Sequence, residues 1–410
     1  MPSAMIIDNA RVILLDRIED GWSVVCDGGR IAWVGPSRER RGMRAETALD
    51  AQGRHLAPGF IDLHIHGSGD FLVDDGPDSL IELSRRLPRY GVTGFLPAVC
   101  PRAKGQDSRF VAQLSKAQPN GAEILGFLLE GPFLTIAGAL AIGSVGEADI
   151  ERVRDLIAAT SPYTAIFTIA PDFPGIADLL PTMRGDGAPI FITHTRADAA
   201  RTQLAIAAGA RHATHFYDVF YSPPESEMGV RPAGAVEAIL ADPCVSVDFI
   251  LDGEHVDPIV VQMALRCKGP DRVCLITDAN RGAGSPPGRY SFGEHEVEFA
   301  YPGGPARFTA DHPTLPGTLA GSGLTMDQAV RNAVDMLGIY LPPAVRMASA
   351  NPARVLGLES RKGQIAVGFD ADLALLDKDL RPLRTWVAGV CRFVADGSDS
   401  PARSKNESED

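Results

Sequence analysis

The chain has 410 residues, of which 45% are hydrophobic and 22% charged, and its formal net charge is −13. This length suits one large domain plus a smaller one, and the acidity argues against a nucleic-acid partner, because such proteins present clustered lysine and arginine. The sequence has neither a secretory signal pattern nor an apolar run long enough to span a bilayer, so we expect a soluble cytoplasmic protein with no membrane partner. Its six scattered cysteines form no CxxC pair and are expected to be buried, reduced thiols.

Short β-strands are predicted at both ends of the chain. At the N-terminal end, turn sequences such as Asp27-Gly28-Gly29 separate apolar or alternating segments. The predicted strands are 4–7, 11–14, 23–26 and 30–34 at this end and 363–365, 371–376 and 385–391 near the other. Because isolated strands must pair, we expect residues 1–57 and 360–395 to combine into one small β-sandwich domain. Residues 396–410 are polar and are expected to be a disordered tail.

Between these ends, residues 58–359 alternate short apolar strands with helical stretches. The predicted strands are 60–66, 92–99, 124–130, 164–170, 189–194, 212–215, 244–250 and 272–278. The predicted helices are 80–87, 150–159, 199–208, 258–265, 325–337 and 343–350. Eight β/α units favour a TIM (β/α)8 barrel over a doubly wound open sheet, since no GxGxxG follows the first strand. Residues 281–320, rich in Gly and Pro, are expected to form a hairpin or lid over the barrel mouth, and Asn351-Pro352 to break the helical pattern.

Imidazoles and carboxylates gather where the predicted strands end. His64 and His66 lie two residues apart, which puts both on one face of a strand. The other members of this group are Glu130, His194, His215, His255 and Asp278. In a barrel, all of these positions meet at the mouth formed by the C-terminal ends of the strands.

Each of these residues also has an ordinary structural explanation. A histidine after an apolar run is more often a capping or core residue than a ligand, and Asp278 can cap a helix. Their convergence favours a metal, because a buried group of imidazoles and carboxylates is costly to leave unpaired. Such ligands suit Zn²⁺, Fe²⁺, Ni²⁺, Mn²⁺ or Co²⁺, and the absence of cysteine ligands argues for a catalytic rather than a structural site.

This arrangement predicts a hydrolase for amide-like bonds. A metal with an open coordination position lowers the pKa of bound water to about 7 and supplies hydroxide as a nucleophile. Asp278 is expected to act as general base and then general acid, handing the proton to a leaving amine. His255 is expected to polarise the scissile carbonyl or to stabilise the oxyanion.

The sequence resembles the amidohydrolase superfamily along nearly its whole length. The segment 58–67, PGFIDLHIHG, is similar to the first-strand signature of that superfamily, and 368–373, GFDADL, fits its composite β domain. Within the superfamily the closest resemblance is to the N-acetylglucosamine-6-phosphate deacetylases. The blocks that carry it are 129–133 (LEGPF), 213–217 (ATHFY), 252–256 (DGEHV), 277–279 (TDA) and 317–322 (GTLAGS).

The resemblance implies the roles of individual residues and the identity of the substrate, an N-acetylated amino-sugar phosphate. Glu130, His194 and His215 would hold the main metal, most simply Zn²⁺, and His64 and His66 with Glu130 a second one, so that each subunit binds one or two ions. Asp278 would be the catalytic acid/base. Arg231 would match an arginine that reaches the substrate phosphate across a homodimer interface. The remaining implied substrate contacts are Ala139, Asp218, Val219, His255, Leu319, Ala320, Gly321 and Ser322.

Two departures from the family pattern support an alternative substrate. Asp218 stands where the family usually has asparagine, and a carboxylate there would repel a phosphate dianion. The segment Gly138-Ala139-Leu140 lacks a histidine that the family uses to contact the sugar. The alternative is an amidohydrolase for a non-phosphorylated N-acyl compound or a cyclic amide. A non-catalytic binding barrel is a third possibility, disfavoured because every metal and acid/base position is filled.

Overall fold

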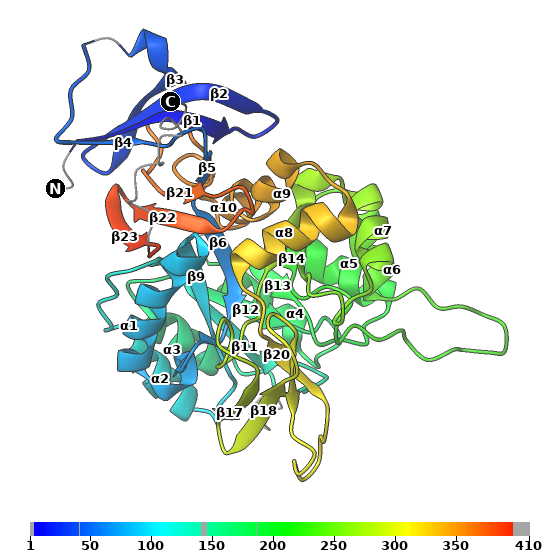
Figure 1. Ribbon diagram of the computed structural model, residues 1–410. Helices are drawn as coiled ribbons and strands as arrows, with labels where there is room; N and C mark the ends of the chain where they lie inside the picture. The colour runs from blue at the N-terminus through cyan, green and yellow to red at the C-terminus, as the bar shows by residue number, and fades with distance from the viewer. Residues whose placement is uncertain (1–3, 41, 141–145, 186, 397–410) are drawn as a thin grey trace.

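A closed parallel barrel forms the centre of the molecule (Figure 1). The computed structural model describes residues 4–40, 42–140, 146–185 and 187–396. The barrel strands, each paired in parallel with the next, are β6 (Phe60–Ile65), β9 (Val92–Val99), β11 (Phe127–Phe133), β12 (Ala165–Ile169), β13 (Ile190–Ile192), β14 (Ala210–Ala213), β15 (Ser246–Ile250) and β16 (Val273–Ile276). A parallel bridge between Ile65 and Ala279 joins the first strand to the end of the last and closes the ring. The predicted TIM barrel is therefore confirmed.

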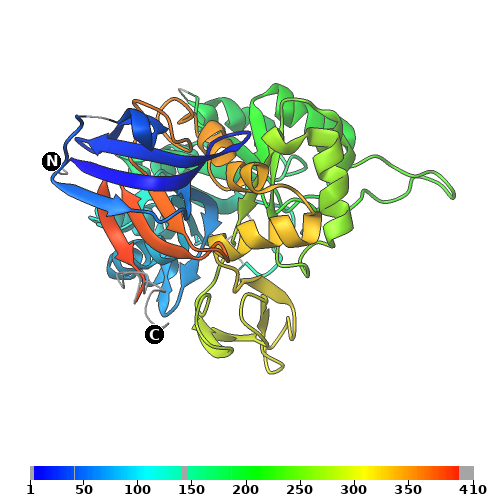
Figure 2. The same ribbon diagram turned by 45° about the horizontal axis from the view of Figure 1, so that its top comes forward.

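Helices surround the barrel in both views (Figures 1 and 2). They are α1 (Pro77–Arg86), α2 (Gln106–Leu114), α3 (Ile150–Thr160), α4 (Ile176–Arg184), α5 (Ala199–Ala207), α6 (Ala235–Ala241), α7 (Pro258–Lys268), α8 (Met326–Leu337), α9 (Leu341–Met347) and α10 (Ala350–Val355). The expectation that Asn351-Pro352 breaks the helical pattern is wrong, because both residues lie in the first turn of α10. Proline is tolerated there, since a backbone N–H in the first turn has no partner within the helix.

The two ends of the chain meet in one β-sandwich domain, as predicted. Its strands are β1 (Met5–Ile13), β2 (Ile18–Asp27), β3 (Arg30–Pro36), β4 (Thr47–Asp50), β5 (His55–Pro58), β21 (Leu373–Leu376), β22 (Pro382–Val387) and β23 (Val390–Val394). The antiparallel pairing of β5 with β21 joins the N-terminal and C-terminal strands. Ile7, Leu56, Leu373 and Trp386 belong to its separate hydrophobic core.

Three local predictions for this domain are corrected. The segment 363–365 is not a strand, and 4–7 and 11–14 are parts of the single strand β1. The segment 385–391 is the end of β22, a turn and the start of β23. Ala388 and Gly389 form that turn with φ angles of 46° and 76°, which is the left-handed conformation of a tight hairpin. Residues 397–410 of the expected tail lie outside the described residues.

An antiparallel sheet extends from the barrel after β16 and forms the predicted hairpin region (Figure 2). Its strands are β17 (Gly288–Phe292), β18 (His295–Phe299), β19 (Pro305–Phe308) and β20 (Leu319–Ser322). A bridge between Ala279 and Ser322 ties β20 to the barrel mouth. The loop between β14 and α6 reaches away from the body of the molecule (Figures 1 and 2).

Three short strands and the 3-10 helices complete the described elements. Near the barrel mouth lie β7 (Gly67–Ser68), β8 (Phe71–Leu72) and η2 (Val73–Asp75), and β10 (Glu123–Ile124) precedes β11. The other 3-10 helices include η1 (Ser37–Glu39), η3 (Leu87–Tyr90) and η5 (Pro270–Arg272). Among the described residues, no helix is long and apolar enough to cross a membrane. All six cysteines are free, but only Cys26 and Cys274 are buried, while Cys244, Cys267 and Cys391 are exposed.

Candidate metal centre

Three of the predicted site residues are positioned at the barrel mouth by the same backbone conformation. His194, His215 and Asp278 each lie two residues beyond the end of a barrel strand, β13, β14 and β16 respectively. All three have positive φ angles, of 48°, 36° and 45°. This conformation is uncommon for residues other than glycine and clusters at functional sites, where it aims side chains that a continuing strand would point elsewhere.

The remaining ligand candidates come from the first and third barrel strands. His64 lies on β6 and His66 directly after it. Glu130 was predicted to end the third strand, but that strand begins later, at Phe127, and Glu130 lies within β11. Ile124 belongs instead to the short strand β10, which pairs with β9.

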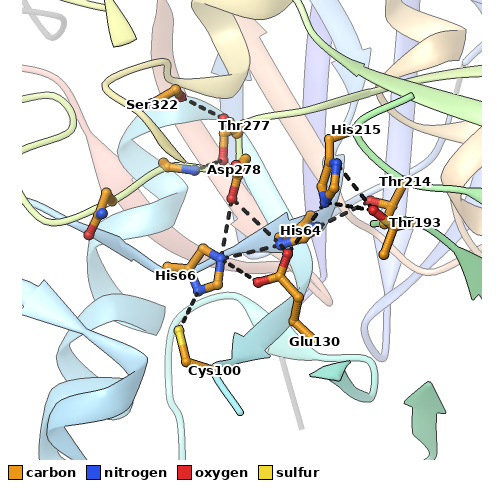
Figure 3. A network of polar contacts seen from close by, with 12 residues as sticks. His64, His66, Cys100, Glu130, Thr193, Thr214, His215, Thr277, Asp278 and Ser322 are labelled. Atoms are coloured by element: carbon orange, nitrogen blue, oxygen red, sulfur yellow. Dashed lines mark hydrogen bonds and ion pairs between the residues drawn. The ribbon is translucent and has the colours of Figure 1, made fainter. Parts of the chain in front are cut away.

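Four imidazoles lie around the carboxylate of Glu130, and Figure 3 shows those of His64, His66 and His215. Its Oε1 lies 3.5 Å from Nε2 of His64, 3.5 Å from Nε2 of His194 and 3.3 Å from Nε2 of His215. Its Oε2 lies 3.1 Å from Nε2 of His66. Asp278 joins the group through Oδ1, which is 3.3 Å from Nε2 of His66.

This donor set fits a divalent cation. Two subsets, His64 with His66 and Glu130, and Glu130 with His194 and His215, each bring three ligand atoms within 4.8 Å of one another. Among the described residues, Glu130 Oε2 and Asp278 Oδ1 are buried without a hydrogen-bond partner. Buried carboxylate oxygens in that state are costly unless a cation compensates them.

The pKa shifts show how strongly the group is coupled. Burial would raise the pKa of Glu130, but the imidazoles, His64 first among the charges, hold it well below its ordinary value. Burial would lower the pKa of His215, but its hydrogen bond to Glu130 and the charge of that carboxylate raise the pKa to about 9. The imidazole of His215 therefore tends to hold a proton beside the carboxylate. Since metal binding needs neutral imidazole, it must release that proton.

Three of the four histidines have an oxygen atom at their second ring nitrogen. Nδ1 of His64 is 3.1 Å from Oγ1 of Thr214, and Nδ1 of His194 is 2.7 Å from the carbonyl oxygen of Ile136. Nδ1 of His215 is 3.4 Å from the carbonyl oxygen of Asp218. Such partners fix the ring orientation and direct Nε2 toward Glu130, although the hydroxyl of Thr193 also lies 3.1 Å from Nε2 of His215.

Two buried aspartates support the site, and sequence reasoning assigned a role to neither. Asp62 accepts from the hydroxyl of Thr277 at 2.6 Å and from the backbone N–H of His64 at 3.3 Å, and burial raises its pKa to about 7. Asp248 accepts from the backbone N–H of His215 at 2.5 Å and contacts Nε2 of His212 at 2.7 Å. The sequence signal that could have identified them is an aspartate inside a largely apolar strand.

A cavity opens next to these ligands and contains most of the predicted substrate contacts. The predicted contacts that line it are Ala139, Asp218, Val219, His255, Leu319, Ala320 and Gly321. Ser322 is fully buried and donates its hydroxyl to the carbonyl oxygen of Thr277 at 2.6 Å. Arg231 lies on the outward-reaching loop, with its side chain 87% exposed and 2.9 Å from Glu237. Among the described lining residues, none is a lysine or an arginine.

His255 is held rigidly at the edge of this cavity. Its side chain is 1% exposed, and its Nδ1 lies 2.7 Å from Oδ2 of Asp252. Burial lowers the pKa of His255, but the hydrogen bond to Asp252 outweighs this effect and raises it above the ordinary value.

Known proteins with similar sequences are amino-sugar phosphate deacetylases. The chain is 34% identical over 366 residues to the N-acetylglucosamine-6-phosphate deacetylase of Vibrio furnissii, covering 88% of each protein. It is 33% identical to the N-acetylgalactosamine-6-phosphate deacetylase of Escherichia coli O157:H7, covering 82% of this chain and 86% of that protein. The human N-acetylglucosamine-6-phosphate deacetylase is 30% identical, covering 95% of this chain and 96% of that protein.

Solved structures agree with this relationship. A mutant N-acetyl-D-glucosamine-6-phosphate deacetylase from Mycobacterium smegmatis, in complex with N-acetyl-D-glucosamine-6-phosphate, superposes with a TM-score of 0.84 at 29% identity, covering 96% of this chain and 100% of that one. The N-acetylglucosamine-6-phosphate deacetylase from Pasteurella multocida superposes with a TM-score of 0.83 at 27% identity, covering 95% of this chain and 99% of that one. The amidohydrolase family model matches residues 308–397. The chain is therefore a hydrolase of carbon–nitrogen bonds and belongs to the N-acetylglucosamine-6-phosphate deacetylase family of the amidohydrolases.

Proposed function

We propose that the chain removes the acetyl group from an N-acetylated amino-sugar phosphate, with N-acetylglucosamine 6-phosphate as its substrate. The observation that carries the proposal is the meeting of Glu130, His194, His215 and Asp278 at one end of the barrel of a chain from this family. Hydrolysis adds water across the amide, so the carbon–nitrogen bond breaks and the products are acetate and an amino-sugar phosphate.

Glu130, His194 and His215 would hold the principal ion, for which Zn²⁺ is the simplest candidate. His64 and His66 would hold a second ion with the same glutamate. Glu130 is the member that the two sets share: its Oε2 faces His66, and its Oε1 faces His64 as well as His194 and His215. When bound, the metal supplies a Lewis acid and an activated water at neutral pH.

Asp278 is the proposed proton carrier. The nearby imidazoles, His64 first among the charges, outweigh the effect of burial and lower the pKa of Asp278, so the group is an ionised base before reaction. Its carboxylate would accept a proton from the attacking water and then deliver it to the amide nitrogen as the carbon–nitrogen bond breaks.

His255 is the proposed electrophilic partner. Its Nδ1–H donates to the carboxylate of Asp252, so Nε2 carries a proton toward the cavity in the imidazolium form, which the raised pKa of His255 favours. An N–H in that position would donate to the acetyl oxygen as negative charge develops on it.

The phosphate would be bound by Arg231 across a homodimer interface. Two observations support this: the described cavity lining lacks a lysine or arginine, and Arg231 lies on a loop that reaches away from its own subunit (Figure 1). Asp218 and Val219 would contact the substrate from within the same subunit.

The activity is tested by incubating Zn²⁺-loaded protein with N-acetylglucosamine 6-phosphate and measuring acetate. We expect release well above that of an Asp278→Asn variant carrying the same amount of metal. Equal, background-level release from both proteins would overturn the proposed substrate.

A second candidate function is hydrolysis of a non-phosphorylated N-acyl compound. It is favoured by the carboxylate of Asp218 in the cavity, which would repel a phosphate dianion. A panel of acetylated sugars with and without phosphate separates the two functions. A higher kcat/KM for the phosphorylated members would exclude this second candidate.

A further inference from the structure

His66 differs from the other three histidines of the centre at its second ring nitrogen. Where His64, His194 and His215 each have an oxygen atom at Nδ1, His66 has the sulfur of Cys100 at 3.7 Å (Figure 3). Cys100 directly follows β9, on the side of His66 that faces away from Glu130. A thiol is a weak acceptor and a poor anchor for a metal ligand, but a thiolate is itself a strong ligand for soft metals.

A carboxylate completes this outer group. Asp74, in η2, accepts from the backbone N–H of Cys100 through Oδ2 at 3.4 Å, and its Oδ1 is held by Arg102 at 3.0 Å. His66, Asp74 and Cys100 each offer one ligand atom, and these three atoms lie within 4.8 Å of one another. Packing holds His66, which is 5% exposed, and the side chain of Asp74, which is 15% exposed, while Cys100 is half-buried.

We propose that Nδ1 of His66, Sγ of Cys100 and a carboxylate oxygen of Asp74 form an additional metal site outside the catalytic centre, suited to a thiophilic divalent ion such as Zn²⁺. Nitrogen, sulfur and oxygen donors are the usual set for zinc, and a water molecule would complete four-coordination. On binding, the thiol of Cys100 loses its proton to solvent. The thiolate and the carboxylate then balance the charge of the ion, while Arg102 stays on Oδ1.

The additional site competes with the catalytic centre for His66. A neutral imidazole has one free lone pair, because its other nitrogen carries the proton. An ion on Nδ1 therefore places the proton on Nε2, where it is directed at Glu130 Oε2, 3.1 Å away, and Asp278 Oδ1, 3.3 Å away. In that state His66 cannot bind an ion together with His64 and Glu130. The outer site thus controls whether the second catalytic position is filled, and this holds whatever substrate the enzyme takes.

The test uses the metal-free full-length chain titrated with Co²⁺, whose bonds to thiolate give a near-ultraviolet charge-transfer band. We expect the band in the wild type and in Cys244→Ser, which removes an exposed cysteine, and its loss in Cys100→Ser. Asp74→Asn keeps the thiol but loses a ligand, so it should need roughly tenfold or more Co²⁺ to develop the band. Circular dichroism and thermal melting establish that each variant is folded.

Two results would overturn the proposal. One is a wild type without a thiolate band at saturating Co²⁺, and the other is a band of equal intensity in folded Cys100→Ser. Competition for His66 is tested separately by the number of Co²⁺ ions bound per chain, which should be the same in the wild type and Cys100→Ser. One additional ion in the wild type would mean that the two positions fill independently.

Discussion

Oδ2 of Asp252 lies 2.7 Å from Nδ1 of His255, while Oδ1 of the same carboxylate accepts the backbone N–H of His255 at 2.9 Å. The Asp252→Asn variant keeps the Oδ1 acceptor and removes the negative charge. We therefore expect it to lower the pKa of His255, because burial then acts without an opposing carboxylate next to the ring. NMR titration of the imidazole in both proteins measures the shift, and an unchanged pKa would show that Asp252 does not set it.

The same pair predicts a pH dependence of stability. The raised pKa of His255 contributes stability that is fully present below the unfolded value, about 6.5, and is lost as the pH rises through the folded pKa. The lowered pKa of Asp252 contributes stability that is present above about 3.9 and is lost as the pH falls through the folded pKa. Asp252→Asn should therefore lower the free energy of unfolding most between about pH 4 and 6.5. Urea denaturation at several pH values checks this, and a loss that is constant with pH would contradict it.

The barrel could be predicted from the sequence because most of its strands are short runs rich in apolar residues and buried on both faces; β14, with Arg211 exposed, is an exception. Local backbone geometry could not be predicted from the sequence. The turn at Ala388-Gly389 needs a positive φ at an alanine, which the residue type disfavours, so two strands were interpreted as one. The start of β11 was misplaced because Ile124 and Phe127 lie in one apolar stretch, and only their pairing partners separate them.

The convergence of the candidate ligands could be predicted because barrel topology brings the strand ends together. Their supports could not, because each depends on contacts between residues far apart in the chain. Asp62 and Thr277 bond across the closure of the barrel, 215 residues apart. Cys100 contacts His66 only because the first two barrel strands are neighbours. No short sequence pattern encodes such a contact.

The two sets of metal ligands predict different metal contents in variants. Glu130→Gln should remove every ion that needs this carboxylate, which belongs to both catalytic sets, and leave at most the ion of the proposed outer site. His66→Asn should remove one ion and leave the one held by Glu130, His194 and His215. Elemental analysis of dialysed protein measures both. His295→Asn, at an exposed position on β18, is the control and should bind as much metal as the wild type. Equal metal contents in Glu130→Gln and the wild type would mean that the ion lies elsewhere.

Asp278→Asn separates proton transfer from metal binding. We expect kcat to fall by about 10²- to 10⁴-fold, the usual contribution of a positioned acid/base group, while the metal held by Glu130, His194 and His215 remains. Steady-state kinetics with matched metal content measures the effect. Asp335→Asn, on the exposed face of α8, should keep wild-type kcat. A fall below tenfold in Asp278→Asn would assign the proton transfer to another group.

Arg231→Ala tests recognition of the phosphate. Losing a charged hydrogen bond worth about 2 kcal/mol should raise KM for N-acetylglucosamine 6-phosphate about 30-fold and leave that for N-acetylglucosamine unchanged. Arg201→Ala, which removes another exposed arginine beside an acidic side chain, is the control. An equal effect on both substrates would argue against a phosphate contact.

Mixing variants tests whether Arg231 acts across a dimer. Arg231→Ala and Asp278→Asn subunits are each defective alone. A mixed dimer has one site in which Asp278 of one subunit meets Arg231 of the other, so exchange of subunits should restore activity at low substrate concentration. No gain on mixing, in a sample shown to have exchanged, would place Arg231 in its own subunit's site or outside both sites.

The packing of the β-sandwich domain against the barrel depends on a buried lysine. The side chain of Lys362 is 1% exposed, and its Nζ lies 2.6 Å from Asp372, next to β21, and 2.7 Å from Glu123, on β10 of the barrel sheet. Lys362→Met would leave the carboxylate of Asp372 without its cation, whereas Glu123 would keep Arg361 at 2.9 Å, and it should lower the free energy of unfolding by about 3–5 kcal/mol. Lys378→Met, which breaks an exposed pair, should leave the free energy of unfolding nearly unchanged. Adding Asp372→Asn to Lys362→Met removes the uncompensated charge and should recover part of the loss in chemical denaturation. If Lys362→Met were no more destabilising than Lys378→Met, the buried ion pairs would have no role in joining the domains.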